Sequence, residues 1–361
     1  MTFWIILFLI TYLLCMCENI SPMNKLPLNK ILVLIIFIVV AFRYMIGWDY
    51  DSYINKFDTV EENDIYMETS FVYLCLILRH FGFDYQMLFL IYALITMFFI
   101  YKAADYYVNN ATLYWGLYLL YPMGMLYSMG QIRQAAAIAI FLWSTKYIVE
   151  NKFFQYVFYV LLATMIHNSA VILIMVYPML KYTLTLRKIF ALSVVAIVAV
   201  TSGLWERCLI DLGEFFDIAY VYYVLNGNGQ LPSWGNFAFY FLMWMICAML
   251  YSNSRKERKD YVIFVMITCC WLSTILFYSS FVLLRIRDYF SLFYILYIVR
   301  DINNVNSYRK RIIFTSLSLL LFAGYFFIYL YNWNTNPSAQ LDNMSMSAGN
   351  INYEFCFKFL K

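Results

Sequence analysis

Charged residues are scarce in this chain of 361 residues, where they make up only 13% of the sequence. A soluble domain carries about 25% charged residues, whereas 64% of the residues here are hydrophobic. This composition excludes a soluble enzyme, a nucleic-acid-binding protein and a disordered chain. Most of the protein must therefore be surrounded by lipid.

Other signals are missing as well. The eight cysteines form no CxxC motif and no Cys/His cluster, and most of them lie in apolar runs, as small core residues do. Residues 1–17 have neither a basic segment nor a small-residue cleavage site, so we expect an uncleaved first helix rather than a signal peptide. No internal repeat is visible, which argues against a transporter built from repeated halves.

The hydrophobic residues form runs of roughly 15–20 residues, the length with which an α-helix crosses a hydrocarbon layer about 30 Å thick. Because backbone groups in lipid must be satisfied internally, these runs predict an all-α membrane protein of about twelve transmembrane helices. The runs are 2–17, 30–46, 86–104, 112–129, 133–149, 153–166, 168–182, 188–203, 236–253, 261–283, 288–300 and 312–331. A shorter run, 69–81, is expected to be an interfacial or re-entrant helix.

Lysine and arginine positions predict the orientation, because cytoplasmic loops retain positive charge. The basic segments 181–188, 255–260 and 300–311 fall on the outer side if 69–81 crosses the membrane, and on the inner side only if it does not. The acidic loops 47–68 and 204–235 then face outward, as do both termini. We expect one polytopic domain over 1–331, followed by a polar tail over 332–361.

Several basic residues at outward helix ends are not needed for this orientation. Arg133 opens a predicted helix, where free N–H groups and the helix dipole also favour an anion. An interfacial arginine that snorkels to lipid headgroups is the alternative.

His167 ends one run, and imidazole suits a general base near neutral pH. A capping or packing histidine is the alternative there. Arg43 lies at another outward end.

Arg285 and Arg287 stand two residues apart, so on a regular helix they would point in directions about 200° apart. One helix face cannot present both of them. Guanidinium suits phosphate because its planar fork donates two hydrogen bonds and keeps its charge. The alternative is an ion pair between Arg285 and Asp288.

The segment from Gly47 to Tyr53 alternates carboxylates with aromatic rings. Asp49 and Asp51 can accept hydrogen bonds from sugar hydroxyls, and ring faces can stack on pyranoses. An interfacial aromatic belt beside an acidic loop is the alternative. Glu68, at the end of this loop, is a second candidate for the base.

The order of these residues resembles one known family. It resembles the EpsG branch of the Wzy-type polysaccharide polymerases over about residues 40–300. The matching motifs are Gly47-x-Asp49 with Tyr53, Glu68, Gln131-Ile132-Arg133-Gln134, Ile166-His167-Asn168-Ser169-Ala170 and Arg285-x-Arg287-x-Tyr289-Phe290.

The resemblance implies a glycosyltransferase of the bacterial inner membrane, similar in fold to the O-antigen ligases. Such an enzyme polymerises oligosaccharide repeat units carried on undecaprenyl pyrophosphate, at the outer face of the membrane. It would need no cofactor, metal or nucleotide sugar. A chain-length regulator and a flippase would be its protein partners.

The chemistry of the residues fits this reaction, because arginines can stabilise the negative charge that grows on a pyrophosphate leaving group. We expect Arg133, with Arg285 or Arg287, to contact the pyrophosphate, and His167 or Glu68 to accept the proton. Further substrate contacts are expected from Asp49, Asp51, Tyr53, Gln134, Arg287 and Arg43. A flippase for the lipid-linked oligosaccharide, or a membrane acyltransferase with His167 as base, are the rival functions.

Overall fold

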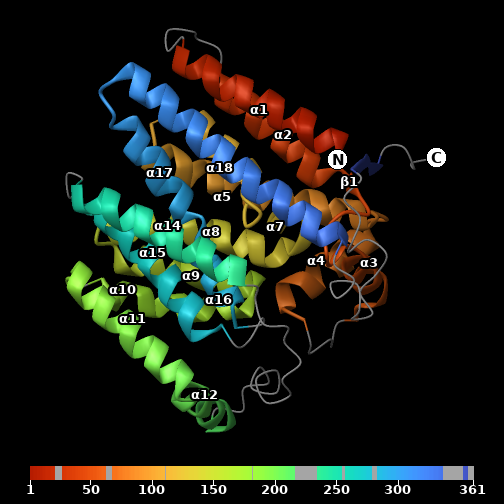
Figure 1. The fold of residues 1–361 in the computed structure, drawn as a ribbon. Helices are drawn as coiled ribbons and strands as arrows, with labels where there is room; N and C mark the ends of the chain where they lie inside the picture. The colour runs from red at the N-terminus through yellow and green to blue at the C-terminus, as the bar shows by residue number, and fades with distance from the viewer. Residues whose placement is uncertain are drawn as a thin grey trace. The chain divides into compact units, whose positions relative to one another are not determined.

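The computed structural model describes residues 1–20, 27–61, 67–109, 111–180, 182–215, 234–253, 257–278, 283–335 and 353–356. Within them the chain is almost entirely helical, as the apolar runs predict (Figure 1). By contact clustering, it divides into two compact units. Unit 1 comprises Met1–Tyr147, Lys152–Val171 and Val299–Lys361, and unit 2 comprises Ile148–Asn151 and Ile172–Ile298.

Unit 1 is built from helices at the two ends of the chain. Its helices are α1 (Thr2–Ile20), α2 (Leu28–Ala41), α3 (Tyr50–Thr59), α4 (Thr69–His80), α5 (Tyr85–Tyr107), α6 (Ala111–Leu120), α7 (Met125–Gly130), most of α8 (Ile132–Val149), α9 (Phe153–Ile166) and α18 (Tyr308–Thr335). The first helix lies along the last one (Figure 1), and Tyr12 and Ser316 join them through a hydrogen bond of 2.7 Å between their side-chain oxygens. Helix α6 lies against α1, α2 and α18 and is buried along its length.

Unit 2 surrounds α15 (Arg258–Leu276), most of whose residues are buried. Three helices lie against α15, namely α11 (Leu186–Thr201), α14 (Trp234–Asn253) and α16 (Arg285–Ser291). The indole N–H of Trp271 on α15 donates to Ser193 Oγ on α11 at 3.0 Å. The remaining helices are α10 (Val176–Met179), α12 (Leu204–Phe215) and most of α17 (Phe293–Asn303). The 3₁₀ helix η1 (Asn168–Met175) passes from unit 1 into unit 2.

The predicted number of spans is not confirmed. Within the described residues, α5, α14, α15 and α18 are long and apolar enough to cross a membrane, and α11 with α12 would be a fifth span bent by 77°. Other apolar helices are shorter: α2 has 14 residues, which extend roughly 21 Å against a hydrocarbon layer of about 30 Å.

Several predicted runs and loops differ from the structure at turn residues and at polar segments. The run 112–129 is divided between α6 and α7 at a turn that contains Pro122 and Gly124, because proline lacks the N–H that a continuous helix needs. The predicted loop 47–68 contains α3, and the predicted loop 204–235 begins with α12. The rest of that second loop, 216–233, lies outside the described residues, as do Lys181, Arg255 and Lys256 of the basic segments.

The C-terminal tail is not without structure. Helix α18 extends to Thr335, and β2 (Glu354–Phe355) pairs antiparallel with β1 (Arg43–Tyr44). The Cys356 N–H donates to the Phe42 carbonyl at 2.9 Å, and the Tyr353 hydroxyl donates to the Val39 carbonyl at 2.8 Å. The tail residues 353–356 therefore hold the chain where it leaves α2, just before the acidic aromatic segment.

Gly47 brings that segment against the end of α7. Its φ of +116° is one that other residues rarely adopt, and a Cβ atom there would collide with the Met129 carbonyl. The same approach recurs at Gly130, where a Cβ would lie 2.6 Å from the Trp48 ring. These two glycines let the backbone of Gly47 touch the backbone of residues 129–130 and let the Trp48 ring lie against Gly130.

We therefore expect Gly47→Ala to lower the thermal stability of the detergent-solubilised protein more than Gly82→Ala does. Gly82 also has a positive φ, +73°, but a Cβ there would meet no atom within 4 Å. Both changes add backbone strain of roughly 1–2 kcal/mol, and only Gly47→Ala adds an overpacking cost of about 1–3 kcal/mol. Equal losses of melting temperature would contradict the close backbone contact.

Candidate functional site

His167 stands at a break between two helices. Helix α9 ends at Ile166, the backbone of His167 is extended, with φ −149° and ψ 113°, and η1 begins at Asn168. A helix end leaves carbonyl groups without partners, and a helix start leaves N–H groups without partners. In a largely apolar protein these groups must find other partners nearby.

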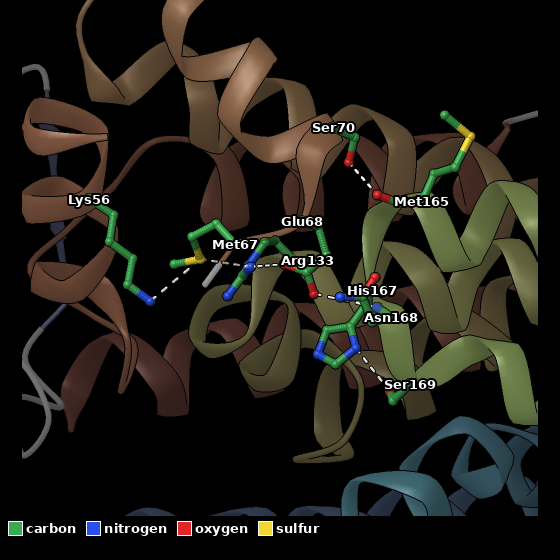
Figure 2. Close-up of polar contacts among 9 residues, drawn as sticks. All are labelled: Lys56, Met67, Glu68, Ser70, Arg133, Met165, His167, Asn168 and Ser169. Atoms are coloured by element: carbon green, nitrogen blue, oxygen red, sulfur yellow. Dashed lines mark hydrogen bonds and ion pairs between the residues drawn. The ribbon is translucent and has the colours of Figure 1, made fainter. Parts of the chain in front are cut away.

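The start of α4 supplies both kinds of partner. The Ser70 hydroxyl donates to the carbonyl of Met165 in the last turn of α9. On the other side of the break, the Asn168 N–H donates to Glu68 Oε1 at 3.4 Å. Figure 2 shows the two contacts on either side of His167. Residues 68–70 are thus fastened to the segment that carries the histidine.

Glu68 also holds Arg133. Its second oxygen, Oε2, forms an ion pair with NH1 of Arg133, which lies in the first turn of α8. The two side chains are 9% and 16% exposed, and removing one partner of such a buried pair costs about 3–5 kcal/mol. One carboxylate therefore connects the predicted anion-binding arginine to the predicted base, through the backbone of Asn168.

Aromatic rings surround the arginine. Its guanidinium carbon lies 5.0 Å from the centre of the Phe71 ring and 5.7 Å from that of Tyr53, within the range of cation–π attraction. The Arg133 Nε atom is buried and has no hydrogen-bond partner within the described part of the chain. The side chain is therefore held in place while one donor is left for an added acceptor.

Tyr53 and Asp49 bring the acidic aromatic segment to the same place. Burial raises the pKa of Tyr53, and Asp49 raises it further, while the nearby Arg133 opposes the shift. The phenol therefore stays protonated at neutral pH and can donate a hydrogen bond. Asp49 stands immediately before α3, and its carbonyl accepts from the Tyr53 N–H at 3.0 Å. Asp51, in the first turn of α3, is half-buried.

The imidazole of His167 has a fixed orientation. The residue is 7% exposed, and Nδ1 of its ring lies 2.8 Å from Ser169 Oγ. This contact keeps the ring in one position, which proton transfer to or from a substrate requires. The histidine, Ser169 and the Glu68–Arg133 pair form the polar cluster drawn in Figure 2.

Arg43 differs from the expectation. It is fully buried, and its nitrogens donate to the carbonyls of Val40, Ile46 and Met129 at 2.7, 3.0 and 2.8 Å. Its guanidinium also lies 4.3 Å from the centre of the Phe89 ring. We therefore withdraw the substrate-binding role predicted for Arg43, because its donors hold the end of α2 to the end of α7.

Gln134 is 1% exposed on the buried side of α8. Gln131, which belongs to the same sequence motif as Arg133, is 5% exposed at the end of α7. Its Oε1 has no hydrogen-bond partner within the residues described. Both amides thus flank Arg133 in sequence and are withdrawn from solvent.

Arg285 and Arg287 belong to unit 2. Arg287 is 8% exposed, and its Nε and NH2 both donate to Asp288 Oδ1, at 3.0 and 2.7 Å. Its guanidinium carbon lies 4.3 Å from the centre of the Tyr240 ring. Asp288 thus pairs with Arg287, and a further ion pair between Arg285 and Asp288 stays an alternative interpretation. Arg285 is half-buried, whereas Arg287 is buried.

Sequence reasoning missed three residues of the unit 1 cluster: Lys56, Met67 and Ser70. Ser70 could have been found from its position two residues after Glu68. Lys56 and Met67 carry no such signal, because only the fold brings α3 and the start of α4 against α8. Among the described residues, no group of three or more His, Cys, Asp and Glu side chains is arranged to hold a metal ion.

The chain was compared with known proteins. No curated protein and no solved structure matched it. The model of the EpsG family matched residues 28–353, nearly the whole chain, a range that includes every residue of the cluster around Glu68. The chain belongs to the EpsG family.

Proposed function

We propose that this protein is a glycosyltransferase that polymerises oligosaccharide repeat units carried on undecaprenyl pyrophosphate. Membership of the EpsG family implies a role of the polysaccharide-polymerase type in a membrane. The main support for this reaction is the Glu68 carboxylate. It pairs with Arg133, which suits an anion, and it accepts from the Asn168 N–H at the helix break that contains His167. An anion-stabilising group and a proton acceptor are the two requirements of this transfer.

The reaction forms one glycosidic bond and breaks another bond at the same carbon. A sugar hydroxyl of the acceptor attacks the anomeric carbon of the donor, and the bond from that carbon to the phosphate oxygen breaks. Negative charge grows on the pyrophosphate as it leaves, and Arg133 stabilises this charge more strongly in the transition state than in the ground state. The proton of the attacking hydroxyl passes to the enzyme.

We assign the proton acceptor to His167 and a positioning role to Glu68. Both oxygens of Glu68 are engaged, one by Arg133 and one by the Asn168 N–H, which suits a carboxylate that positions other groups. The imidazole is oriented by Ser169. Asp49, Asp51, Tyr53 and Gln134 are proposed to contact the sugars.

The remaining parts of the proposal come from the sequence. Arg285 and Arg287 are proposed to contact the pyrophosphate because of their order in the family motif and the chemistry of guanidinium. The hydrophobic runs support about twelve crossings and a single domain over 1–331, and family membership supports the bacterial inner membrane. The positions of lysine and arginine support a site that faces outward. A flippase and a chain-length regulator are the proposed protein partners.

We expect Arg133→Ala and Arg285→Ala each to abolish long glycan in a strain that lacks the chromosomal gene, because the leaving group loses charge stabilisation. The electrophoretic ladder of the surface glycan measures this. A polymerase-deficient strain still displays a single repeat unit, whereas a flippase-deficient strain displays none. Arg187→Ala, at an exposed position on α11, is the control and should leave the ladder unchanged. Normal chain length in both site variants would contradict the assignment.

We expect His167→Ala to reduce the turnover of the purified protein by roughly 10²–10⁴-fold, the usual contribution of a general base. The exposed His80 on α4 provides the matched control, and His80→Ala should retain full activity. In the unmodified enzyme, turnover should fall at acidic pH as the imidazole takes up a proton. A residual activity of His167→Ala that falls in the same way would exclude the histidine as the base.

A further inference from the structure

We propose that α12 lies along the membrane surface and that one of its faces contacts the acyl chains of the lipid. This inference goes beyond the proposed function and concerns unit 2 alone. It is carried by a sharp bend between α11 and α12 and by the way the exposed side chains of α12 separate into an apolar and a charged set.

A glycine separates α12 from the helix before it. The Gly203 N–H donates to the Val200 carbonyl at 3.1 Å, and the Gly203 carbonyl accepts from the Arg207 N–H at 3.2 Å. The φ of Gly203 is +71°, which glycine adopts without strain. The chain bends there by 77°, and Figure 1 shows α12 turned away from the end of α11. If α11 crosses a membrane, α12 therefore runs nearly along the membrane surface.

One side of α12 is turned toward the protein. It consists of Trp205, Leu209 and Gly213, which follow one another at the four-residue spacing of neighbours on a helix and are buried or half-buried. The centre of the Trp205 ring lies 6.0 Å from that of Phe277, at the end of α15. This contact fixes which sides of α12 are left exposed.

The exposed surface of α12 has two parts. The first, the apolar stripe, has the same four-residue spacing and consists of Leu204, Cys208 and Leu212. Its two leucines are 58% and 53% exposed. The second part, the charged face, adjoins the apolar stripe and consists of Glu206, Arg207, Asp211 and Glu214.

No single solvent suits both parts of this surface. In hydrocarbon the exposed charges would be costly, so α12 is not the second half of a bent span. In water the apolar surface of the two leucines would be left uncovered. At the boundary between lipid and water, the apolar stripe reaches acyl chains while the charged face stays in water.

The surface of α11 indicates that lipid is what covers the apolar stripe. On the side away from α15, α11 exposes large apolar side chains, among them Phe190, Val195 and Val198 at 67%, 64% and 56%. In a membrane protein such a surface is covered by lipid tails, which are as apolar as these side chains. The apolar stripe begins at Leu204, three residues after α11 ends at Thr201. It therefore continues a surface that lipid already covers.

The charges of α12 specify which part of the lipid it contacts. The charged face has three carboxylates and one guanidinium, and this excess of negative charge repels anionic headgroups. Binding therefore depends on the apolar stripe and needs no anionic lipid. An inward shift would move carboxylates into hydrocarbon, and an outward shift would expose the leucines to water. The helix α12 thus fixes the depth of unit 2 in the bilayer.

The test uses the full chain in lipid nanodiscs, with a nitroxide spin label on α12. Cys17 and Cys208 are exposed and the other cysteines are buried, so Cys17→Ser directs the label to Cys208. Power saturation in electron paramagnetic resonance compares collisions with oxygen, which concentrates among acyl chains, and with a nickel chelate, which stays in water. We expect oxygen collisions to dominate at Cys208, at a depth of about 5–10 Å in the boundary between headgroups and acyl chains.

Asp211→Cys, combined with Cys17→Ser and Cys208→Ser, is the matched control on the charged face. Its label should collide mainly with the nickel chelate. Leu212→Cys and Arg207→Cys repeat the comparison between the two parts of the surface, so the test remains decisive if one variant fails to fold. Only variants that elute from size exclusion with the unmodified protein are compared.

Three results would overturn the inference. Dominant nickel collisions at both positions, 208 and 211, would place α12 in water. Dominant oxygen collisions at both would make α12 part of a bent span. Few collisions of either kind at position 208 would show that protein, from this chain or from a second copy, covers the apolar stripe.

The lipid composition tests which part of the lipid is bound. The depth at position 208 should be the same in nanodiscs of phosphatidylcholine alone and in nanodiscs that also contain phosphatidylglycerol. A depth that is reached only with phosphatidylglycerol would assign the contact to anionic headgroups and contradict the proposal.

Discussion

An interrupted helix in an apolar protein leaves backbone groups that cannot turn to water, and the cluster in unit 1 depends on how this protein satisfies them. At the break around His167, the carbonyl of Met165 accepts from Ser70, and the N–H of Asn168 donates to Glu68. The break gives the histidine a backbone position outside a regular helix. The partners of these backbone groups are Ser70 in α4 and Glu68 just before it. The same short segment therefore serves both the packing of the break and the polar cluster.

The Glu68 carboxylate also balances the positive charge of Arg133 in this cluster. Glu68 neutralises Arg133 in a largely buried position, and the aromatic rings of Tyr53 and Phe71 add attraction to the guanidinium. Replacing the carboxylate would affect the arginine and the helix break at once. Arginine, helix break and histidine are therefore coupled through one side chain, although they are distant in sequence.

Arg43 shows a different use of an arginine. It has the same charge as Arg133, yet it donates to three carbonyls and is fully buried. Together with Gly47 and the strand pair β1–β2, it holds the segment that leads to Asp49 and Tyr53. A charged residue at a helix end of a membrane protein can thus bind backbone carbonyls or a substrate. Its hydrogen-bond partners in the structure distinguish these two roles.

Much of the fold followed from hydrophobicity. The helical nature of the chain and most helix positions were predicted because an apolar backbone must form its own hydrogen bonds. The family was also recognisable, because the order of Asp49, Glu68, Arg133 and His167 along the chain can be read without knowing the distances between them. The helix α3 was missed, because its polar face and short length look like a loop. The role of the tail residues 353–356 was missed because strand pairing joins distant segments.

The sequence by itself determined that the protein is helical, apolar and a member of the EpsG family, because composition and motif order do not depend on distance. Only the tertiary structure decided which charges meet. It brought Glu68 to Arg133 and to the break at His167. It also paired the Arg43 guanidinium with backbone carbonyls and placed Lys56 and Arg133 beside the sulfur of Met67. The physical reason is that ion pairs and hydrogen bonds act over a few ångströms, and the packing of helices far apart in sequence decides which groups come that close.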